Sequence, residues 1–271
     1  MRTEYEFTLS RDAGIDKTLA VLRAYGIVHI PNFIPAEDIA ALREEFEELF
    51  KQSAGWIRTV NYEHGRALSV HRDGIDAGKF PVFARTFDDD VMKVLTDQYL
   101  GKPNLVNNDI YLTHDQPNPE PINPLHFDKI LSLKFFLYLL DTSEESGAFQ
   151  FVPKSHLIGR KLANEHLRYG GRMETIGNRT TEQEMIAQAL PIEGPAGTMI
   201  IFDTDGYHRG GVVQPGRERM VMRGHSHTDP MPVYKPKPFS QQWWHESPLN
   251  PARFSGKVPA KRIWNEQTVA R

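Results

Sequence analysis

The chain has 271 residues, of which 39% are hydrophobic and 10% aromatic, enough to bury the core of one large domain. Its 32 basic and 35 acidic residues leave a formal charge of −3, so no overall basic field favours nucleic acid or an anionic membrane. The absence of cysteine excludes disulfides, thiolate metal sites and cysteine nucleophiles, so a bound metal would have to use His, Asp or Glu side chains.

The segment that begins the chain, residues 1–14, lacks the apolar centre of a signal peptide. No stretch elsewhere has the uninterrupted apolar length of a membrane span. We therefore expect a soluble, cytoplasmic protein with neither nucleic acid nor membrane as a partner.

The first hundred residues contain helical patterns. Apolar residues at helical spacing predict a helix over residues 18–25, closed by Gly26. A short strand, IVHIPNF, follows, and an amphipathic helix then extends from Pro35 to Phe50. A third helix is predicted over residues 88–100.

The segment between the second and third helices, residues 53–79, is polar and rich in Gly and His. It shows neither the helical nor the strand period. Because a segment of this length inside a compact domain is more often functional than idle, we predict a mobile flap that borders the active site as a lid.

From Leu105 onward, short runs rich in β-branched and aromatic residues alternate with turn residues. The predicted strands lie in NLVNNDIYLT, LSLKFFLYLLD, GAFQFVP, TMIIFD and RMVMRGHSHT. Such strands after N-terminal helices favour a mainly β protein, a jelly roll or barrel.

We expect a single domain over residues 1–271. It would comprise a helical cover at about 1–104, a β core at about 105–228 interrupted by a polar insert at 157–190, and a wrapping tail at 229–271.

Candidate metal ligands lie close to two of these predicted strands. His126 and Asp128 are two residues apart, so on an extended strand both side chains leave the same face. His208 follows a buried apolar strand at a turn. Two histidines and one carboxylate form the facial triad that leaves positions open on Fe(II). Arg219, eleven residues later, could bind a carboxylate through two hydrogen bonds.

The pattern of HFD at 126–128, ESGAFQFVPKSH, GTMIIFDTDGYHRGG and the spacing to Arg219 resembles the phytanoyl-CoA dioxygenase family of Fe(II)/2-oxoglutarate oxygenases. The resemblance covers residues 105–228, and AYGIVHIPNFIPAEDIAALREEFEEL resembles the family's N-terminal pattern. It implies a double-stranded β-helix, iron held by His126, Asp128 and His208, and 2-oxoglutarate paired with Arg219.

The implied activity is that of a dioxygenase, which uses O₂ to oxidise and most simply hydroxylate a small metabolite, releasing succinate and CO₂. Family members act on acyl-CoA esters, amino acids and many secondary metabolites. Asp128 argues against the halogenating relatives, which have a small residue at this position. Lys154, Arg160 and Lys161 form only a modest basic cluster, so a substrate other than a CoA ester is favoured.

Further residues are candidates for co-substrate or substrate contacts. Lys134 is expected to point into the barrel, toward the co-substrate carboxylate or out to water, and Asn108 to bond 2-oxoglutarate unless the register places Asn107 there. Arg223 should share a face with Arg219 and either bind an anionic substrate group or, as we favour, pair with Asp203 or Asp205. His71 could contact substrate.

Two other functions remain open from the sequence. One is a redox-inert, cupin-like isomerase or hydrolase that uses the same ligands on another metal, a reading that gives Arg219 no task. The other is a non-catalytic barrel that keeps an ion for structure, although structural sites normally close their coordination sphere.

Overall fold

The computed structural model describes residues 1–2, 4–86, 91–101, 104–106, 109–121, 123–128, 132–163 and 179–228. The strands are β1 (Ile27–Ile30), β2 (Ile57–Tyr62), β3 (Gly65–His71), β4 (Asn104–Val106), β5 (Asp109–Asp115), β6 (Leu133–Tyr138), β7 (Phe149–Phe151), β8 (Leu190–Ile192), β9 (Met199–Asp203), β10 (His208–Arg209) and β11 (Arg219–Thr228). The helices are α1 (Ile15–Tyr25), α2 (Ala36–Phe50), α3 (Pro81–Thr86), α4 (Val91–Leu100), α5 (Ser155–Ala163) and α6 (Arg179–Gln188), with a 3₁₀ turn, η1 (Arg72–Gly74).

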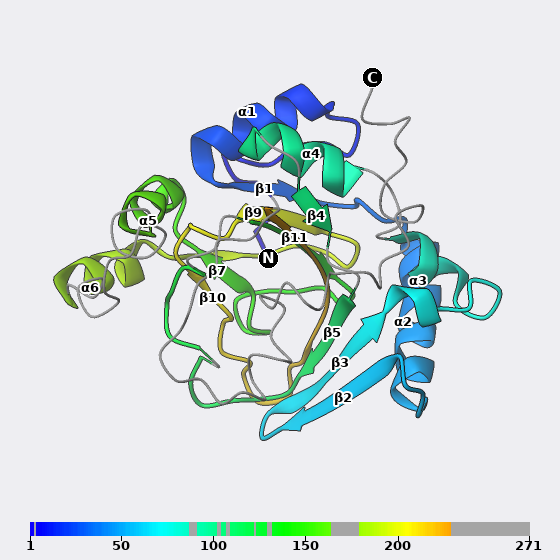
Figure 1. Ribbon diagram of the computed structural model, residues 1–271. Coiled ribbons are helices and arrows are strands. Elements are labelled where there is room, and N and C mark those ends of the chain that lie inside the picture. Colours follow the sequence, from blue (N-terminus) through cyan, green and yellow to red (C-terminus); the bar gives the residue numbers. More distant parts are fainter. Residues whose placement is uncertain are drawn as a thin grey trace, which may run out of the picture.

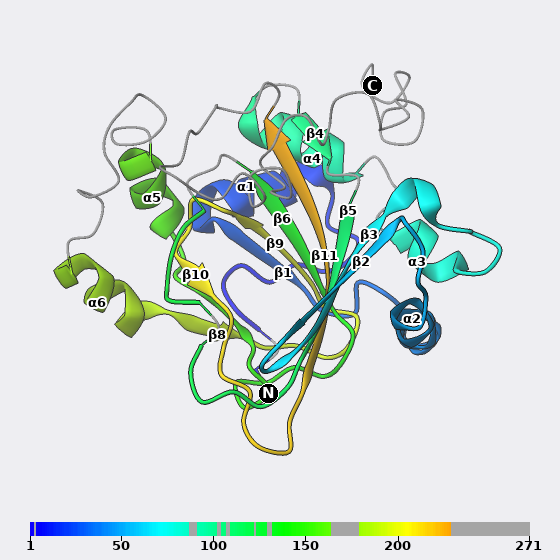
Figure 2. The ribbon, with the colours of Figure 1, turned by 60° about the horizontal axis from the view of Figure 1, so that its bottom comes forward.

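The strands form two antiparallel sheets. The large sheet has the order β1-β9-β6-β11-β5-β3-β2, with β4 also paired to β11, and the small sheet has the order β10-β7-β8. Figure 2 shows the large sheet as a fan of strands from β1 to β2, with β10 and β8 to one side of it. This two-sheet arrangement confirms the predicted jelly-roll fold.

Helices cover the outer face of the large sheet. In Figure 1, α1 and α4 lie side by side over the β1 end, and α2 and α3 lie near β3. Alternation along β6 explains this cover, because Leu133, Phe135 and Leu137 join the core cluster that contains the helix residues Leu22 and Phe46. Phe136 and Tyr138 alternate with these residues and join the second core cluster, which contains Phe149 and Phe151 of the small sheet.

The first helix ends where the sequence predicted. Gly26 adopts a left-handed conformation, with φ of 75°, and its N–H bonds to the carbonyl of Leu22. A side chain there would also collide with the ring of His156. The chain therefore turns at once into β1, which is buried along its whole length and pairs with β9.

The prediction that residues 53–79 lack regular structure is wrong. This segment contains the hairpin of β2 and β3, and β3 pairs along its length with β5. The strand pattern is weak because one face of β3 has the apolar Leu68 and Val70, whereas the other has the small Ala67 and Ser69. The hairpin extends the large sheet, and its role as a lid stays a prediction.

The large sheet also begins earlier than the expected boundary near residue 105. It includes β1, β2 and β3 from the region expected to be a helical cover. The polar insert at 157–190 contains most of α5 and all of α6, which lie on the side of the molecule opposite α2 and α3 (Figure 1). The predicted tail at 229–271 lies outside the described residues. In the part of the chain that is described, no helix combines the length and apolarity needed to cross a bilayer.

Candidate metal centre

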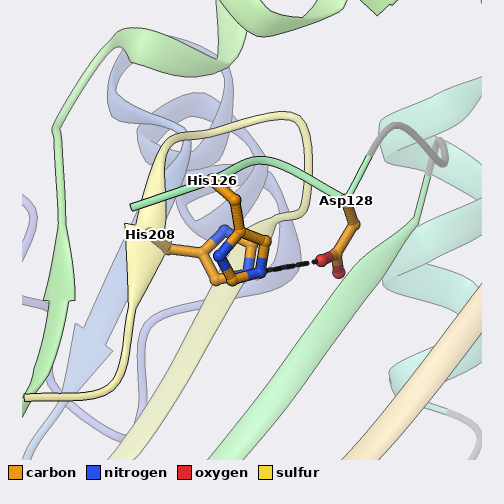
Figure 3. Close-up of side chains that lie close together, drawn as sticks. All are labelled: His126, Asp128 and His208. Carbon is orange, nitrogen blue, oxygen red and sulfur yellow. Dashed lines mark ion pairs between the residues drawn. The ribbon is translucent and has the colours of Figure 1, made fainter. Parts of the chain in front are cut away.

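Three predicted ligands meet at one point between the two sheets. His126 and Asp128 lie in the segment between β5 and β6, and His208 is the first residue of β10. Asp128 Oδ1 lies 3.4 Å from His126 Nε2 and 3.6 Å from His208 Nε2. Figure 3 shows the carboxylate pointing toward the two imidazole rings, whose centroids are 4.6 Å apart. This is the one His/Asp/Glu cluster with metal-binding geometry among the described residues.

Backbone hydrogen bonds hold the two ligand segments together. His126 N–H donates to the carbonyl of His208 at 3.0 Å, and His208 N–H donates to the carbonyl of His126 at 2.7 Å. Asp128 N–H donates to the carbonyl of Thr204 at 2.8 Å. Each ligand is therefore held at its main chain, as a preorganised metal site requires.

The histidines are held in the tautomer that suits a metal. Nδ1 of His126 lies 2.8 Å from the carbonyl oxygen of Pro124, and Nδ1 of His208 lies 2.8 Å from that of Gly206. Because a carbonyl oxygen can only accept, Nδ1 carries the proton in both rings. Both Nε2 lone pairs are then directed to the common point.

The ionisation of the site also suits a cation. Burial alone would raise the pKa of Asp128, but the nearby Lys134 ammonium and the two histidines hold that pKa well below its usual range. Burial lowers the pKa of His208 to about 3, against the opposing effect of Asp128. A carboxylate anion and a neutral imidazole are the protonation states that bind metals.

A cavity of about 280 Å³ extends from this point between the sheets. The large sheet contributes Ala67, Thr113, Asp115, Lys134, Phe136, Arg219, Val221 and Arg223, and the small-sheet side contributes Phe149, His208, Arg209 and Gly210. His208 is 5% exposed at its side chain and His126 is 36% exposed. With this volume the cavity is close to the smallest size usual for a small-molecule site.

Residues 22–221 match the phytanoyl-CoA dioxygenase (PhyH) family. The chain belongs to this family. Comparison with curated proteins gives no match.

Solved structures share the fold. The epimerase SnoN from nogalamycin biosynthesis, in complex with Fe³⁺, alpha ketoglutarate and nogalamycin RO, is 17% identical with a TM-score of 0.59, covering 83% of this chain and 87% of its own. The carbocyclase SnoK from nogalamycin biosynthesis is 18% identical with a TM-score of 0.59, and the match covers 84% of this chain and 88% of SnoK. HygX from Streptomyces hygroscopicus, with nickel and 2-oxoglutarate bound, is 15% identical with a TM-score of 0.53, covering 77% and 85%.

In this PhyH-family chain, Arg219 is a buried residue that lines the cavity. It stands opposite Asp115 in the pairing of β11 with β5. Its Nε and Nη2 donate to Asp115 Oδ2 at 2.8 and 2.7 Å, and its Nη1 donates to the carbonyl of Gly147. Sequence reasoning missed Asp115. Its one signal is the strand alternation that puts it on the same face as Tyr111 and Thr113.

The loop that presents His208 is supported by a buried charged network. Asp203 and Asp205 are fully buried, and both accept hydrogen bonds from Arg160 of α5. The hydroxyl of Tyr99 donates to Asp203 at 2.6 Å. The sequence did not predict Arg160 of α5 as a partner of these aspartates. The favoured pairing of Arg223 with one of them stays a prediction. Because Arg160 forms ion pairs with both aspartates, its charge does not add to that of Lys154 and Lys161 for binding a CoA phosphate.

Of the other predicted contact residues, Arg223 and Lys134 line the cavity and His71 does not. Arg223 lines the cavity, with its guanidinium carbon 6.0 Å from the ring centre of Tyr111 and 5.7 Å from that of Phe136. Lys134 also lines it and forms an ion pair with Asp128. His71 ends β3 opposite Asp109 and is not among the described lining residues. Asn107 and Asn108 lie outside the described residues.

Proposed function

We propose that this PhyH-family protein is a non-haem, Fe(II)- and 2-oxoglutarate-dependent oxygenase that oxidises, most simply by hydroxylation, a small-molecule metabolite. The observation that carries the proposal is the convergence of His126 Nε2, His208 Nε2 and Asp128 Oδ1 on one point of a cavity wall. Iron and 2-oxoglutarate, when bound, supply the oxidising power by coupling O₂ reduction to release of succinate and CO₂.

The three protein ligands would hold the metal and leave its other positions facing the cavity. Arg219 is the proposed partner of the far carboxylate of 2-oxoglutarate. Gly210 supports this role, because a Cβ there would lie 3.2 Å from Arg219 Nη2 and would fill the space in front of the guanidinium. Asp115 and the Gly147 carbonyl orient the guanidinium, so the co-substrate would meet a group already held in place.

The remaining cavity wall would orient the substrate and exclude water. Phe136, Phe149 and Val221 give it an apolar surface, and Arg223 offers one cation to a substrate group. We propose Asn108 as a further co-substrate contact and His71 as a substrate contact. Epimerisation and ring closure, the activities named for SnoN and SnoK, are alternative outcomes in the same fold.

Succinate formation tests the proposal without knowledge of the substrate. The purified protein with Fe(II), 2-oxoglutarate and O₂ should form succinate slowly, and faster with the correct metabolite. A redox-inert isomerase, a hydrolase or a structural metal barrel would form none. Absence of succinate in the metal-loaded protein, with a metabolite panel present, would reject the oxygenase.

The metal ligands provide a second test. Replacing His126, Asp128 or His208 by Ala should remove most metal affinity and all succinate formation, because each supplies one of three protein ligands and no thiolate can substitute. Metal content after dialysis measures this. His64→Ala is the matched control, since His64 lies in the turn between β2 and β3 and does not line the cavity. Full turnover by His208→Ala would overturn the ligand assignment.

A further inference from the structure

The two oxygens of the Asp128 carboxylate have different neighbours. Oδ1 faces the two imidazole Nε2 atoms, at 3.4 and 3.6 Å. Oδ2 forms an ion pair with Lys134 Nζ. The carboxylate therefore presents one oxygen to the metal position and the other to an ammonium group.

Lys134 approaches from a rigid part of the fold. It lies on β6, which pairs with β9 on one side and β11 on the other. Its chain neighbours, Leu133 and Phe135, are buried in the core beneath the helices. The side chain of Lys134 is 20% exposed and that of Asp128 is 14% exposed, so water screens this pair only partly. The position of the ammonium is thus set by the central strands and not by a mobile loop.

We propose that Lys134 is a positioning residue that keeps Asp128 a one-oxygen ligand of the metal, an inference that rests on the proposed oxygenase function. Carboxylates bind cations through either one or two oxygens. With Oδ2 held by the ammonium, only Oδ1 is available to the ion.

The consequence concerns the number of open metal positions. Three protein atoms leave three of the six positions of an octahedral ion open, enough for two atoms of 2-oxoglutarate and one of O₂. A two-oxygen Asp128 would leave only two, so 2-oxoglutarate would fill the sphere and O₂ would have no place. Lys134 would therefore act on O₂ access through Asp128, without touching the co-substrate.

The experiment counts exchangeable waters on Mn(II) bound to the protein, by water-proton relaxation or by magnetic resonance in ¹⁷O-water. Lys134→Met keeps the length of the side chain and removes its charge, and Lys134→Arg keeps a donor for Oδ2. We expect three waters in the wild type and the Arg variant and two in the Met variant. Addition of 2-oxoglutarate should leave one water in the first two proteins and none in the Met variant.

Succinate formation by the Fe(II) forms gives a parallel measurement. It should fall by about 10- to 100-fold in Lys134→Met, the range usual for groups that orient metal ligands, and recover largely in Lys134→Arg. Lys134→Gln is a second neutral variant, used if the Met variant does not fold.

The outcomes separate the possible roles of Lys134. Three waters in a folded neutral variant would overturn the proposal. Weaker 2-oxoglutarate binding with an unchanged water count would instead identify Lys134 as a direct co-substrate contact, and would also overturn it. If 2-oxoglutarate displaces no water from the wild-type protein, the oxygenase function fails, while the water counts without 2-oxoglutarate still test the effect of Lys134 on Asp128.

Discussion

Arg219 is the residue whose function can be separated most cleanly from metal binding. Arg219→Ala should raise the 2-oxoglutarate concentration needed for half-maximal succinate formation by about 100-fold or more, because a buried bidentate partner of the carboxylate is lost. The metal should remain bound, since Arg219 is not one of the three ligands and its hydrogen bonds to Asp115 and Gly147 do not hold them. Titration of 2-oxoglutarate into the Mn(II) form measures both effects. An unchanged affinity would place the carboxylate-binding group elsewhere, with Lys134 the first alternative.

Asp115 should stabilise the fold through its buried ion pair with Arg219. Asp115 is 2% exposed and Arg219 is 8% exposed, so Asp115→Leu leaves a buried cation without its carboxylate partner. We expect the free energy of unfolding to fall by about 3–5 kcal/mol. The double variant Asp115→Leu, Arg219→Met should recover much of that loss, because neither charge then remains buried. Urea unfolding of the metal-free proteins tests this, and a double variant no more stable than Asp115→Leu would contradict it.

The residues of the site differ in how far the sequence could reveal them. The chemistry and spacing of His126, Asp128 and His208 predicted a metal site, and the structure brings them together. The partners of charged residues were not predictable in this way. Asp115 meets Arg219 through the register of β5 with β11, and Arg160 reaches Asp203 through the placement of α5. Both depend on contacts between distant segments, which local patterns do not encode.

Helix α5 contacts the loop that precedes His208, and we expect this contact to hold that metal ligand in place. A Cβ on Gly159 would lie 1.9 Å from the carbonyl oxygen of Asp205, so the helix and loop touch at their backbones. Gly159→Ala should therefore weaken metal binding by about tenfold or more, because the loop must shift. The free energy of unfolding should also fall by about 1–3 kcal/mol, although alanine is the better helix former.

Gly14→Ala is the matched control for this change. Gly14 precedes α1, and a Cβ there would meet nothing within 4 Å. It should leave Mn(II) affinity unchanged. If Gly159→Ala binds Mn(II) as tightly as the control, the placement of His208 does not depend on α5.

Elements with a strong period were predicted well. The strand RMVMRGHSHT is β11 as the structure has it, and the amphipathic pattern after Pro35 is α2. The hairpin of β2 and β3 was missed because its own residues give a weak strand pattern, whereas β3 pairs along its length with β5. Its edge strand, β2, includes the exposed Arg58 and Thr59, which is how edge strands avoid further pairing. Tertiary contact, and not local pattern, forms this element.

Buried histidines should make the entire fold sensitive to acid. Burial lowers the pKa of His29 and of His156 from 6.5 to about 4, and that of His208 to about 3. The unfolded chain therefore binds more protons than the folded chain between these values and pH 6.5. Stability should be fully present above pH 6.5 and fall as the pH decreases toward 4, by up to about 1.4 kcal/mol per pH unit for each histidine.

Unfolding by urea at a series of pH values measures this loss on the metal-free protein. His29→Leu should reduce the slope, because it removes one titrating group while Thr8 Oγ1 keeps its hydrogen bond from Tyr5 N–H. A stability that stays constant from pH 6.5 to 4, or a variant with the slope of the wild type, would contradict the expectation.

The backbone hydrogen bonds between His126 and His208 bring together two metal ligands that lie far apart in the sequence. An ion held by both histidines closes the long stretch of sequence between them, so it acts as a cross-link. This chain has no cysteine and therefore no disulfide to do so. Because the ion binds only where the two histidines are brought together, it adds stability to the folded state by mass action. We therefore expect iron starvation to make the protein more rapidly degraded by proteases, in addition to abolishing the proposed activity.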